Sequence, residues 1–336
     1  MGKPRILVTH PLVFLTDEDL TRRFDIRQLD SELPIGGEQL KHELAGKDGA
    51  VCFLIDRFSA DVLQATNDLK VISSVSAGLD HIDLAEATAR GIYVTNTPTA
   101  LTNSVAEFAI AIMLALSRRI TEADAIVRSG QWKGGWGLTY MLGSELKGKS
   151  VGIIGLGRIG TAVAKKLGAF DVSLSYCSRT RKIEAEQSLG IRYLSLDDLL
   201  SISDYVIICV SLSDQTRGMI GERELLLMRE SAYLVNVSRG QVIDEASLVK
   251  VLREKKIAGA ALDVFEKEPI GNDHPLAQLK NVFLSPHIGS ATKEARRAMV
   301  LDAIENLTAI FEGIEAPNIA NPEVMKRRPL KVVKML

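Results

Sequence analysis

The chain has 336 residues, of which 46% are hydrophobic and 25% charged, and its formal net charge is −1. This composition is typical of a globular protein, and the lack of a basic excess argues against a nucleic acid or a membrane as the partner. The three cysteines are too few and too widely spaced for a disulfide framework or a zinc site, which favours a reducing compartment. No apolar leader precedes the segment RILVTH, so we expect a cytoplasmic protein.

Short β-rich segments alternate with helical patterns along the first hundred residues. We expect strands at residues 5–10, 50–55, 70–75 and 92–96, with helical periodicity between them, for example over residues 59–66. This alternation predicts βαβ units, and therefore a mostly parallel sheet with helices on both faces.

A long helix is predicted next, from about residue 104 to residue 129. Ser104 and Glu107 have the spacing of an N-terminal capping box, and Gly130 supplies a stop. The following segment, residues 130–143, is rich in glycine and contains both tryptophans. We expect it to be a surface loop that meets a partner or the substrate.

A second alternating set begins near residue 150. Six strands are expected, at residues 150–154, 172–176, 205–210, 232–237, 257–262 and 282–285. Six strands with helices between them match a doubly wound dinucleotide-binding sheet. A last long helix is expected over residues 292–311. The predicted fold class is therefore α/β, with two Rossmann-like, doubly wound parallel-sheet domains and a cleft between them.

The position of the second set predicts the domain boundaries. Residues 100–289 are expected to form the dinucleotide-binding domain, including the helix and loop of residues 104–143. Residues 1–99 and 290–336 are expected to form a discontinuous, flavodoxin-like substrate-binding domain.

The segment GLGRIG, from Gly155 to Gly160, has the glycine spacing of a dinucleotide-binding loop. It follows an apolar strand and opens a helix, which is the context that this motif requires. Gly155 permits a tight turn, Gly157 lets the backbone approach a pyrophosphate, and Gly160 allows close packing of helix on strand. The start of the helix, at Arg158 and Ile159, offers free N–H groups and the positive end of the helix dipole. We interpret the segment as a dinucleotide site rather than a merely structural turn.

The residue about twenty positions after this loop distinguishes the two nicotinamide cofactors. An acidic residue there binds the ribose hydroxyls of NAD, but this chain has Cys177. It is followed by Ser178, Arg179, Thr180 and Arg181, and hydroxyl and guanidinium groups suit a phosphate dianion. The segment predicts a 2′-phosphate clamp and a preference for NADPH, with NADH still possible. A solvated basic turn is the alternative.

Reducing a carbonyl group by hydride requires a proton donor, which at neutral pH is usually a histidine. We expect His10, His42 and His274 at the surface or in turns. His81 lies beside a glycine turn and could approach a ligand. His287 follows an apolar strand and precedes another glycine turn, at a strand end of the kind where open α/β sheets bind ligands.

Charged residues follow two other predicted strands. Arg239 comes after a buried strand and needs an anionic partner, either a substrate carboxylate or a structural salt bridge. Asp263, Glu266 and Glu268 follow a third strand. A carboxylate paired with a histidine fixes the tautomer of the ring and favours its charged form.

Five longer motifs follow one another along the chain. They are SAGLDHIDL, RGIYVTNTPTALTNSVAEF, NVSRGQVIDEASL, AGAALDVFEKEP and LSPHIGSAT. Together they resemble the D-isomer-specific 2-hydroxyacid dehydrogenases, over nearly the whole chain from residue 5 to residue 322. Within this family the chain is most similar to the glyoxylate/hydroxypyruvate reductases. One departure is Ser211, where many members have proline.

The resemblance implies roles for individual residues. It makes His287 the acid/base, Glu268 its partner, Arg239 the ligand of the substrate, and Asp263 the holder of the nicotinamide carboxamide. The implied substrate-binding residues are Leu54, Ala77, Gly78, Arg239, His287, Ser290 and, from the other subunit of a homodimer, Trp136. The glycine pattern, the basic turn and the resemblance together give the cofactor-binding residues Gly155, Gly157, Arg158, Ile159, Gly160, Ser178, Arg179, Thr180, Val210, Ser211, Thr216, Val237, Asp263, His287 and Gly289.

The predicted function is the NADPH-dependent reduction of a small 2-oxo acid, glyoxylate or hydroxypyruvate, to the D-2-hydroxy acid. One alternative is an NAD-dependent dehydrogenase of another substrate, such as 3-phosphoglycerate or D-lactate. Another is a nicotinamide-sensing, corepressor-like binding protein. We expect a homodimer and no metal site, and the tail after Asn321 has no role that the sequence indicates.

Overall fold

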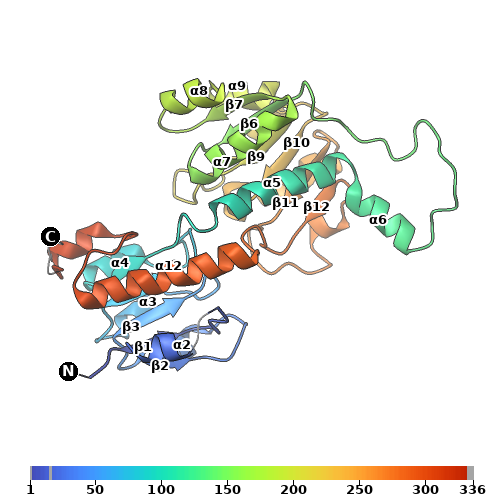
Figure 1. Ribbon diagram of the computed structural model, residues 1–336. Helices are drawn as coiled ribbons and strands as arrows, with labels where there is room; N and C mark the ends of the chain where they lie inside the picture. The colour runs from blue at the N-terminus through green and yellow to red at the C-terminus, as the bar shows by residue number, and fades with distance from the viewer. Residues whose placement is uncertain (1, 15–16, 331–336) are drawn as a thin grey trace. The chain divides into compact units, whose positions relative to one another are not determined.

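The structure, a computed structural model, describes residues 2–14 and 17–330. The chain divides into two units (Figure 1). The first unit contains the residues up to Leu101 together with those from Thr292 onward, and the second unit contains Thr102–Ala291. The sequence places the corresponding boundaries after residue 99 and before residue 290. Residues 331–336 of the tail lie outside the described residues.

The first unit is built on a parallel sheet of five strands in the order β2-β1-β3-β4-β5, which is the flavodoxin-like order. The strands are β1 (Arg5–Val8), β2 (Asp25–Gln28), β3 (Gly49–Cys52), β4 (Val71–Ser74) and β5 (Tyr93–Thr95). The helices are α1 (Asp17–Thr21), α2 (Gly37–Leu44), α3 (Ala60–Gln64), α4 (Leu84–Ala89), α12 (Lys293–Glu312) and the 3₁₀ helix η4 (Pro322–Lys326). Helix α12 packs along β3, β4 and β5. It therefore brings the end of the chain back onto the first sheet.

The second unit is built on a parallel sheet of seven strands in the order β12-β11-β10-β9-β6-β7-β8. The strands are β6 (Ser150–Ile154), β7 (Ser173–Cys177), β8 (Arg192–Tyr193), β9 (Tyr205–Ile208), β10 (Tyr233–Asn236), β11 (Gly259–Leu262) and β12 (Val282–Leu284). Strand order reverses between β6 and β9, and ligands bind at such a switch point in doubly wound sheets.

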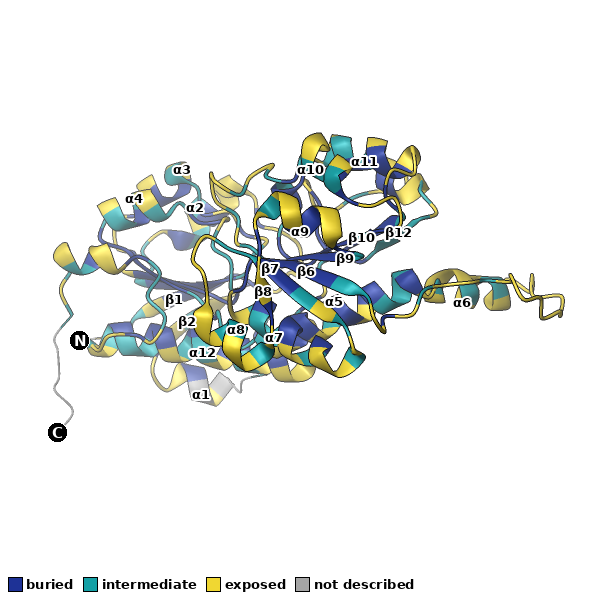
Figure 2. Ribbon diagram, turned by 90° about the horizontal axis from the view of Figure 1, so that it is seen from above, coloured by how far each residue is buried: buried dark blue, intermediate teal, exposed yellow. Residues whose placement is uncertain are grey.

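Helices cover both faces of this second sheet (Figure 2). The α-helices are α5 (Thr102–Ser117), α6 (Ile120–Arg128), α7 (Arg158–Leu167), α8 (Ile183–Leu189), α9 (Leu196–Ile202), α10 (Glu222–Leu227) and α11 (Glu245–Arg253). The 3₁₀ helices are η1 (Gly168–Phe170), η2 (Gly240–Val242) and η3 (Pro275–Gln278). Strands β9 and β11 are buried along their whole length, as expected for inner strands of a parallel sheet. Each fully buried Leu or Ile contributes about 1.5–3 kcal/mol to such a core.

The structure contains two strands that the sequence pattern does not predict, β2 and β8. Both lie at a sheet edge. Strand β2 has the sequence DIRQ and is mostly exposed, and both residues of β8 are exposed. Strands of this kind carry no apolar run, because most of their side chains face the solvent and not the core. The second sheet therefore has seven strands, one more than the six that the sequence predicts.

The single helix predicted over residues 104–129 is wrong, because two helices occupy this region. They are separated at Arg119, which has φ 53° in the left-handed region. The capping box is also wrong, since α5 begins at Thr102 and Ser104 donates its hydroxyl to the carbonyl of Gly289 at 2.9 Å. Glu107 instead forms an ion pair with Lys166.

His10 differs from its expected place at the surface. Its side chain is buried, and its Nε2 lies 2.8 Å from the buried carboxylate of Asp56. Its Nδ1 lies 2.5 Å from the carbonyl oxygen of Ser31. Within residues 2–14 and 17–330, no helix has the length and apolar character needed to cross a membrane.

Candidate active site

The glycine loop follows β6 at the switch point of the second sheet. Gly155 has φ 96°, and a Cβ there would lie 2.7 Å from Val210. A Cβ on Gly160 would lie 2.1 Å from the carbonyl oxygen of Gly155. A Cβ on Gly157, by contrast, would meet nothing within 4 Å. The fold thus excludes side chains at the first and third glycines and leaves the backbone at the second one open to a ligand.

Helix α7 begins directly after this loop, with Gly157 at its N-cap and no side-chain capping bond. Arg158 and Ile159 form the first helical positions, where backbone N–H groups have no intrahelical acceptor. Uncapped N–H groups and the positive end of a ten-residue helix make a suitable place for a phosphate group.

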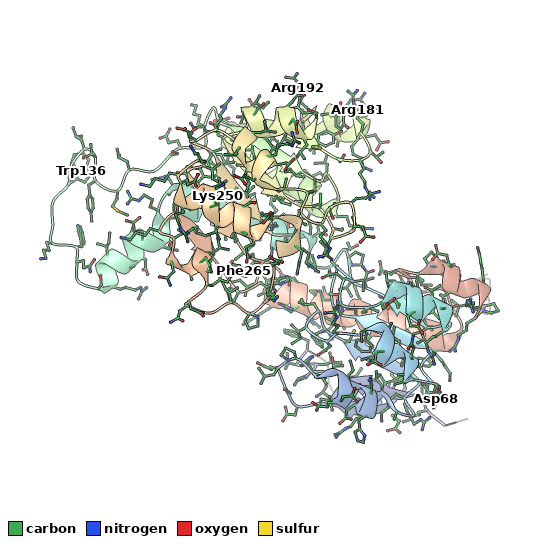
Figure 3. The ribbon with its side chains drawn as sticks, turned by 180° about the vertical axis from the view of Figure 1, so that it is seen from behind. Asp68, Trp136, Arg181, Arg192, Lys250 and Phe265 are labelled. Carbon is green, nitrogen blue, oxygen red and sulfur yellow. The ribbon has the colours of Figure 1, made fainter. Side chains whose placement is uncertain are left out.

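The basic turn lies at the end of the neighbouring strand β7. Arg181 donates three hydrogen bonds to the carboxylate of Glu186, at 2.8, 2.9 and 3.2 Å, and its guanidinium also lies over the ring of Tyr193. The hydrogen bond from Arg181 is the largest of the effects that lower the pKa of Glu186 to about 2. Figure 3 shows Arg181 at the periphery of the second unit. Arg181 is therefore engaged by a carboxylate of its own chain.

The rest of this turn is more open. Arg179 is exposed and makes a 3.3 Å hydrogen bond to the side chain of Gln215, and Thr180 is exposed as well. Ser178 donates its hydroxyl to the carbonyl of Thr180 at 2.6 Å, which shapes the turn. Of the two arginines in the segment, Arg179 is thus the one whose guanidinium is not paired with a carboxylate of the described residues.

Other expected cofactor contacts lie at the carboxyl ends of neighbouring strands. Val210 follows β9 and Val237 follows β10. In the loop after β9, the Thr216 hydroxyl donates to the carbonyl of Ser211 at 2.7 Å. Because all strands of the sheet are parallel, these residues lie on the same side of the sheet as the glycine loop, at the carboxyl ends of the strands.

His287 lies just beyond β12 and is paired with Glu268. Its Nδ1 is 2.8 Å from a carboxylate oxygen of Glu268, and its Nε2 has no hydrogen-bond partner among the described residues. Burial acts to raise the pKa of Glu268, but the hydrogen bond and charge of His287, with the charge of Arg239, hold it below its usual range. An ionised Glu268 accepts a hydrogen bond from the Nδ1–H group, so the tautomer is fixed and Nε2 is the nitrogen available to a substrate.

The backbone of His287 has φ 55°, an unusual conformation for a residue other than glycine. Asp263 holds it there. The carbonyl of Asp263 accepts from the N–H of His287 at 2.9 Å, and its carboxylate accepts from the N–H groups of Ile288 and Gly289 and from the hydroxyl of Ser285. Burial raises the pKa of Asp263 against the effect of these donors. Asp263 thus braces the loop that carries the histidine.

Arg239 follows β10 and is half-buried. Its guanidinium donates to the carbonyl of Ser238 at 2.9 Å, and its charge lowers the pKa of Glu268. The turn that carries it is held by Asn236, whose amide donates to the Arg239 carbonyl and accepts from Ser238. Arg239, Glu268 and His287 therefore belong to one charged group in the second unit. No cluster of three or more metal-ligating side chains exists among residues 2–14 and 17–330.

The remaining expected substrate contacts are distributed over both units. Leu54, Ala77 and Gly78 belong to the first unit, and Ser290 to the second. Trp136 lies in the extended segment after α6 and is 86% exposed (Figure 3). The structure of the single chain therefore brings Arg239, Glu268 and His287 together and leaves Trp136 in the solvent.

Comparison with known proteins identifies the family of this chain. A model of the D-isomer specific 2-hydroxyacid dehydrogenase NAD binding domain matches residues 110–289. A glyoxylate reductase of Thermofilum pendens is 46% identical over 338 residues, which covers 100% of both chains. The chain belongs to the D-isomer-specific 2-hydroxyacid dehydrogenase family.

Further relatives of this dehydrogenase have similar names. A glyoxylate reductase of Aeropyrum pernix is 46% identical, over 98% of this chain and 99% of its own. Among solved structures, an NADPH-dependent glyoxylate/hydroxypyruvate reductase from Sinorhizobium meliloti, in complex with NADP and malonate, is 33% identical with a TM-score of 0.85, and covers 98% of this chain and 99% of its own.

The predicted resemblance and fold class are confirmed by these matches. The dehydrogenase is an NAD(P)-dependent oxidoreductase that acts on the CH–OH group of 2-hydroxy acids. What the sequence did not indicate is the bracing of its loops by Asp263, Ser285 and Asn236. The only available signal was their place at strand ends, since a hydrogen bond to a distant backbone group leaves no periodic pattern.

Proposed function

We propose that this dehydrogenase reduces a small 2-oxo acid, glyoxylate or hydroxypyruvate, to the D-2-hydroxy acid with NADPH. The observation that carries the proposal is the His287–Glu268 pair at 2.8 Å, which leaves Nε2 of His287 without a partner among the described residues. The curated relatives named glyoxylate reductase, at 46% identity over the full chain, support the substrate class.

A nicotinamide nucleotide supplies the hydride when it is bound. In our proposal, protonated His287 delivers a proton from Nε2 to the carbonyl oxygen of the substrate. Glu268 accepts a hydrogen bond from Nδ1 and so orients the ring. Arg239 binds the substrate carboxylate, and its planar guanidinium suits two parallel hydrogen bonds to a carboxylate. Its partial burial strengthens this attraction by excluding water.

We further propose substrate contacts from both units. The backbone N–H groups of Ala77 and Gly78 in the first unit would bind the substrate carboxylate, and Leu54 and Ser290 would line the pocket. The half-buried state of Leu54 and Ser290 is compatible with this role.

The preference for NADPH is part of the proposal. Cys177 occupies the place of the acidic residue that NAD requires, and a thiol does not repel a 2′-phosphate. Arg179, with Ser178 and Thr180, would hold that phosphate. The relative from Sinorhizobium meliloti, whose structure contains NADP, supports this choice.

We also propose that two chains associate through α5, α6 and the segment that follows, so that Trp136 of one chain enters the substrate site of the other. The support is the apolar character of this region. Its exposed large hydrophobic residues are Ile120, Val127, Trp132, Trp136, Leu138, Tyr140 and Leu142. A row of exposed apolar side chains on this scale is typical of an interaction surface.

The three free cysteines accord with a cytoplasmic location.

The experiment is a turnover assay on the purified protein with glyoxylate and hydroxypyruvate. The loss of absorbance of NADPH and of NADH is followed at matched concentrations. We expect oxidation of NADPH with a kcat/KM many times that for NADH. Faster oxidation of NADH would refute the cofactor assignment. Binding of NADPH without turnover of either acid would refute the reductase and favour a nicotinamide sensor.

A further inference from the structure

The turn from Ser76 to Leu79, which follows β4 in the first unit, has all its carbonyl oxygens engaged. The Ser76 carbonyl accepts from the backbone N–H of Thr97 at 2.8 Å and from its hydroxyl at 3.2 Å. The Ala77 carbonyl accepts from the side-chain amide of Asn96 at 2.7 Å. The Gly78 carbonyl accepts from the Ser76 hydroxyl at 2.7 Å, and the Leu79 carbonyl accepts from the N–H of Ile82 at 3.0 Å.

The N–H groups of the same turn, in contrast to its carbonyls, are not engaged in hydrogen bonds with other described residues. Those of Ala77, Gly78 and Leu79 donate to no group in the part of the chain that the structure describes. Successive unpaired N–H groups in a turn form a concave site for an anion. The turn is therefore one-sided, with its acceptors satisfied internally and its donors left for a ligand.

Each engaged carbonyl determines the direction of one particular N–H group. A peptide unit is planar and trans, so its C=O and N–H bonds point in opposite directions. Asn96 holds the carbonyl of Ala77 and thereby directs the N–H of Gly78. Thr97 directs the N–H of Ala77 in the same way. The Ser76 hydroxyl holds the carbonyl of Gly78 and so directs the N–H of Leu79.

The hydrogen bond from Ser76 to Gly78 is the last of a series of three, which begins at His81 and continues through Ser74. A carbonyl can only accept, so Ser76 must donate its single proton to Gly78, and its oxygen must accept from the Ser74 hydroxyl 2.7 Å away. The Ser74 proton is then used, so the contact of 3.0 Å between Ser74 and Nε2 of His81 requires a proton on Nε2. All three side chains are buried, which excludes water as a substitute partner.

Asn96, the side chain that holds the carbonyl of Ala77, is itself held by the C-terminal part of the chain. Its carbonyl accepts from the amide of Asn306, a fully buried residue of α12, at 3.1 Å. Its N–H donates to the carbonyl of Asn318 at 3.2 Å. Asn96 therefore has little freedom to rotate away from Ala77, and the turn is supported from two independent directions.

We propose that Asn96, Ser76 and His81 are positioning residues for substrate binding. They keep the carbonyls of the turn engaged, so that its N–H groups point toward the substrate carboxylate and no peptide oxygen turns toward it. This inference rests on the proposed role of Ala77 and Gly78 and adds the side chains that make the turn selective for an anion. It gives His81 a function that involves no contact with the substrate.

The test uses Asn96→Ala and Ser76→Ala in the full-length protein. Loss of either brace should raise KM for glyoxylate about tenfold, the scale of one hydrogen bond to a charged group. The turnover number kcat should change much less, because the chemical groups of the second unit are intact. Affinity for NADPH should be unchanged for the same reason. Ser76→Thr retains the hydroxyl and should restore KM, and His81→Phe should raise KM by less than Ser76→Ala.

Thr66→Val is the matched control. The Thr66 hydroxyl is buried and donates to the carbonyl of Leu63 at 2.8 Å in the same unit, without contact to the turn. This variant should lower the melting temperature and leave KM unchanged. If Asn96→Ala and Ser76→Ala likewise affect only the melting temperature, the braces are merely structural and the inference is wrong. Should Asn96→Ala fail to fold, Ser76→Ala and Ser76→Thr decide the question alone.

Binding of oxalate, measured by calorimetry in the presence of NADPH, separates this inference from the proposed reaction. Oxalate carries the carboxylate of glyoxylate but accepts no hydride. Oxalate binding that is weaker in Asn96→Ala and Ser76→Ala than in the wild type, and unchanged in Thr66→Val, supports the inference. This holds even if the wild-type protein turns over neither 2-oxo acid. Equal oxalate binding in all four proteins overturns it.

Discussion

The loop around His287 and the turn from Ser76 to Leu79 present their functional groups in opposite ways. Both follow strands of a parallel sheet, and both are held by buried polar groups. The loop of the second unit presents a side chain, the imidazole of His287. The turn of the first unit presents backbone N–H groups. A substitution can therefore remove the first group directly, whereas it reaches the second only through the side chains that brace the turn.

The largest effect should come from the side chain that moves the proton. His287→Asn should lower kcat with glyoxylate by about 10²–10⁴, the usual contribution of general acid catalysis. NADPH affinity, measured by fluorescence titration, should change little. His274→Asn is the matched control, because His274 is also a half-buried histidine of the second unit paired with a carboxylate, Glu245, at 3.1 Å. Comparable losses of kcat in the two variants would refute the assigned role.

The next effect concerns the side chain that binds the carboxylate. Arg239→Lys keeps the charge but loses the planar pair of donors. We expect kcat/KM for glyoxylate to fall about 10- to 100-fold, which corresponds to the ~1.5–3 kcal/mol of a hydrogen bond to a charged group. Arg223→Lys, at an exposed ion pair with Asp197, should leave steady-state kinetics unchanged. An unaltered kcat/KM in Arg239→Lys would mean that Arg239 is a structural cation.

A third effect should fall on the choice of cofactor. Arg179→Gln should lower the ratio of kcat/KM for NADPH to that for NADH by about 10- to 100-fold, from the loss of one charged hydrogen bond. Arg181→Gln should change this ratio far less, because Glu186 already engages that guanidinium. If the two variants give the reverse order, Arg181 releases Glu186 to bind the phosphate and the clamp must be reassigned.

The smallest effect should be on stability, and it concerns His10, a buried histidine of the first unit. Both ring nitrogens of His10 face acceptors, Asp56 and Ser31, so both must carry protons. Burial lowers the pKa of His10, but Asp56, the Ser31 carbonyl and the charge of Glu32 outweigh it, so the pKa is raised from 6.5. The resulting stabilisation is complete below pH 6.5 and is lost as pH rises through the folded-state pKa.

Differential scanning fluorimetry from pH 6 to pH 9 tests this prediction. The melting temperature of the wild-type protein should fall by a few degrees more over this range than that of His10→Gln. His42→Gln, which alters an exposed histidine of the same unit, should follow the wild-type curve. Parallel curves for the wild type and His10→Gln would show that folding does not raise the pKa of His10.

The sequence predicted those parts of the molecule that leave a local pattern. Inner strands such as β9 and β11 appear as apolar runs, and the glycine loop from Gly155 to Gly160 has a spacing that only certain turns require. The polar edge strands β2 and β8 have no such pattern. The break at Arg119 was missed because the periodicity of apolar residues continues across it.

The same limit applies to the site. Residues at strand ends, such as Arg239 and His287, could be identified from their position after apolar segments. Long-range partners could not, because Asp56 lies 46 residues from His10 and Asp263 lies 26 residues from Gly289. Such pairs depend on the order of strands in the sheet, which the sequence pattern alone does not determine.

The most direct test of the proposed function is the product formed from hydroxypyruvate. The wild-type protein would be incubated with NADPH and hydroxypyruvate, and the glycerate formed would be separated into its enantiomers and compared with the NADPH consumed. We predict one D-glycerate for each NADPH oxidised. Formation of L-glycerate, or binding of NADPH with no glycerate formed, would contradict the account.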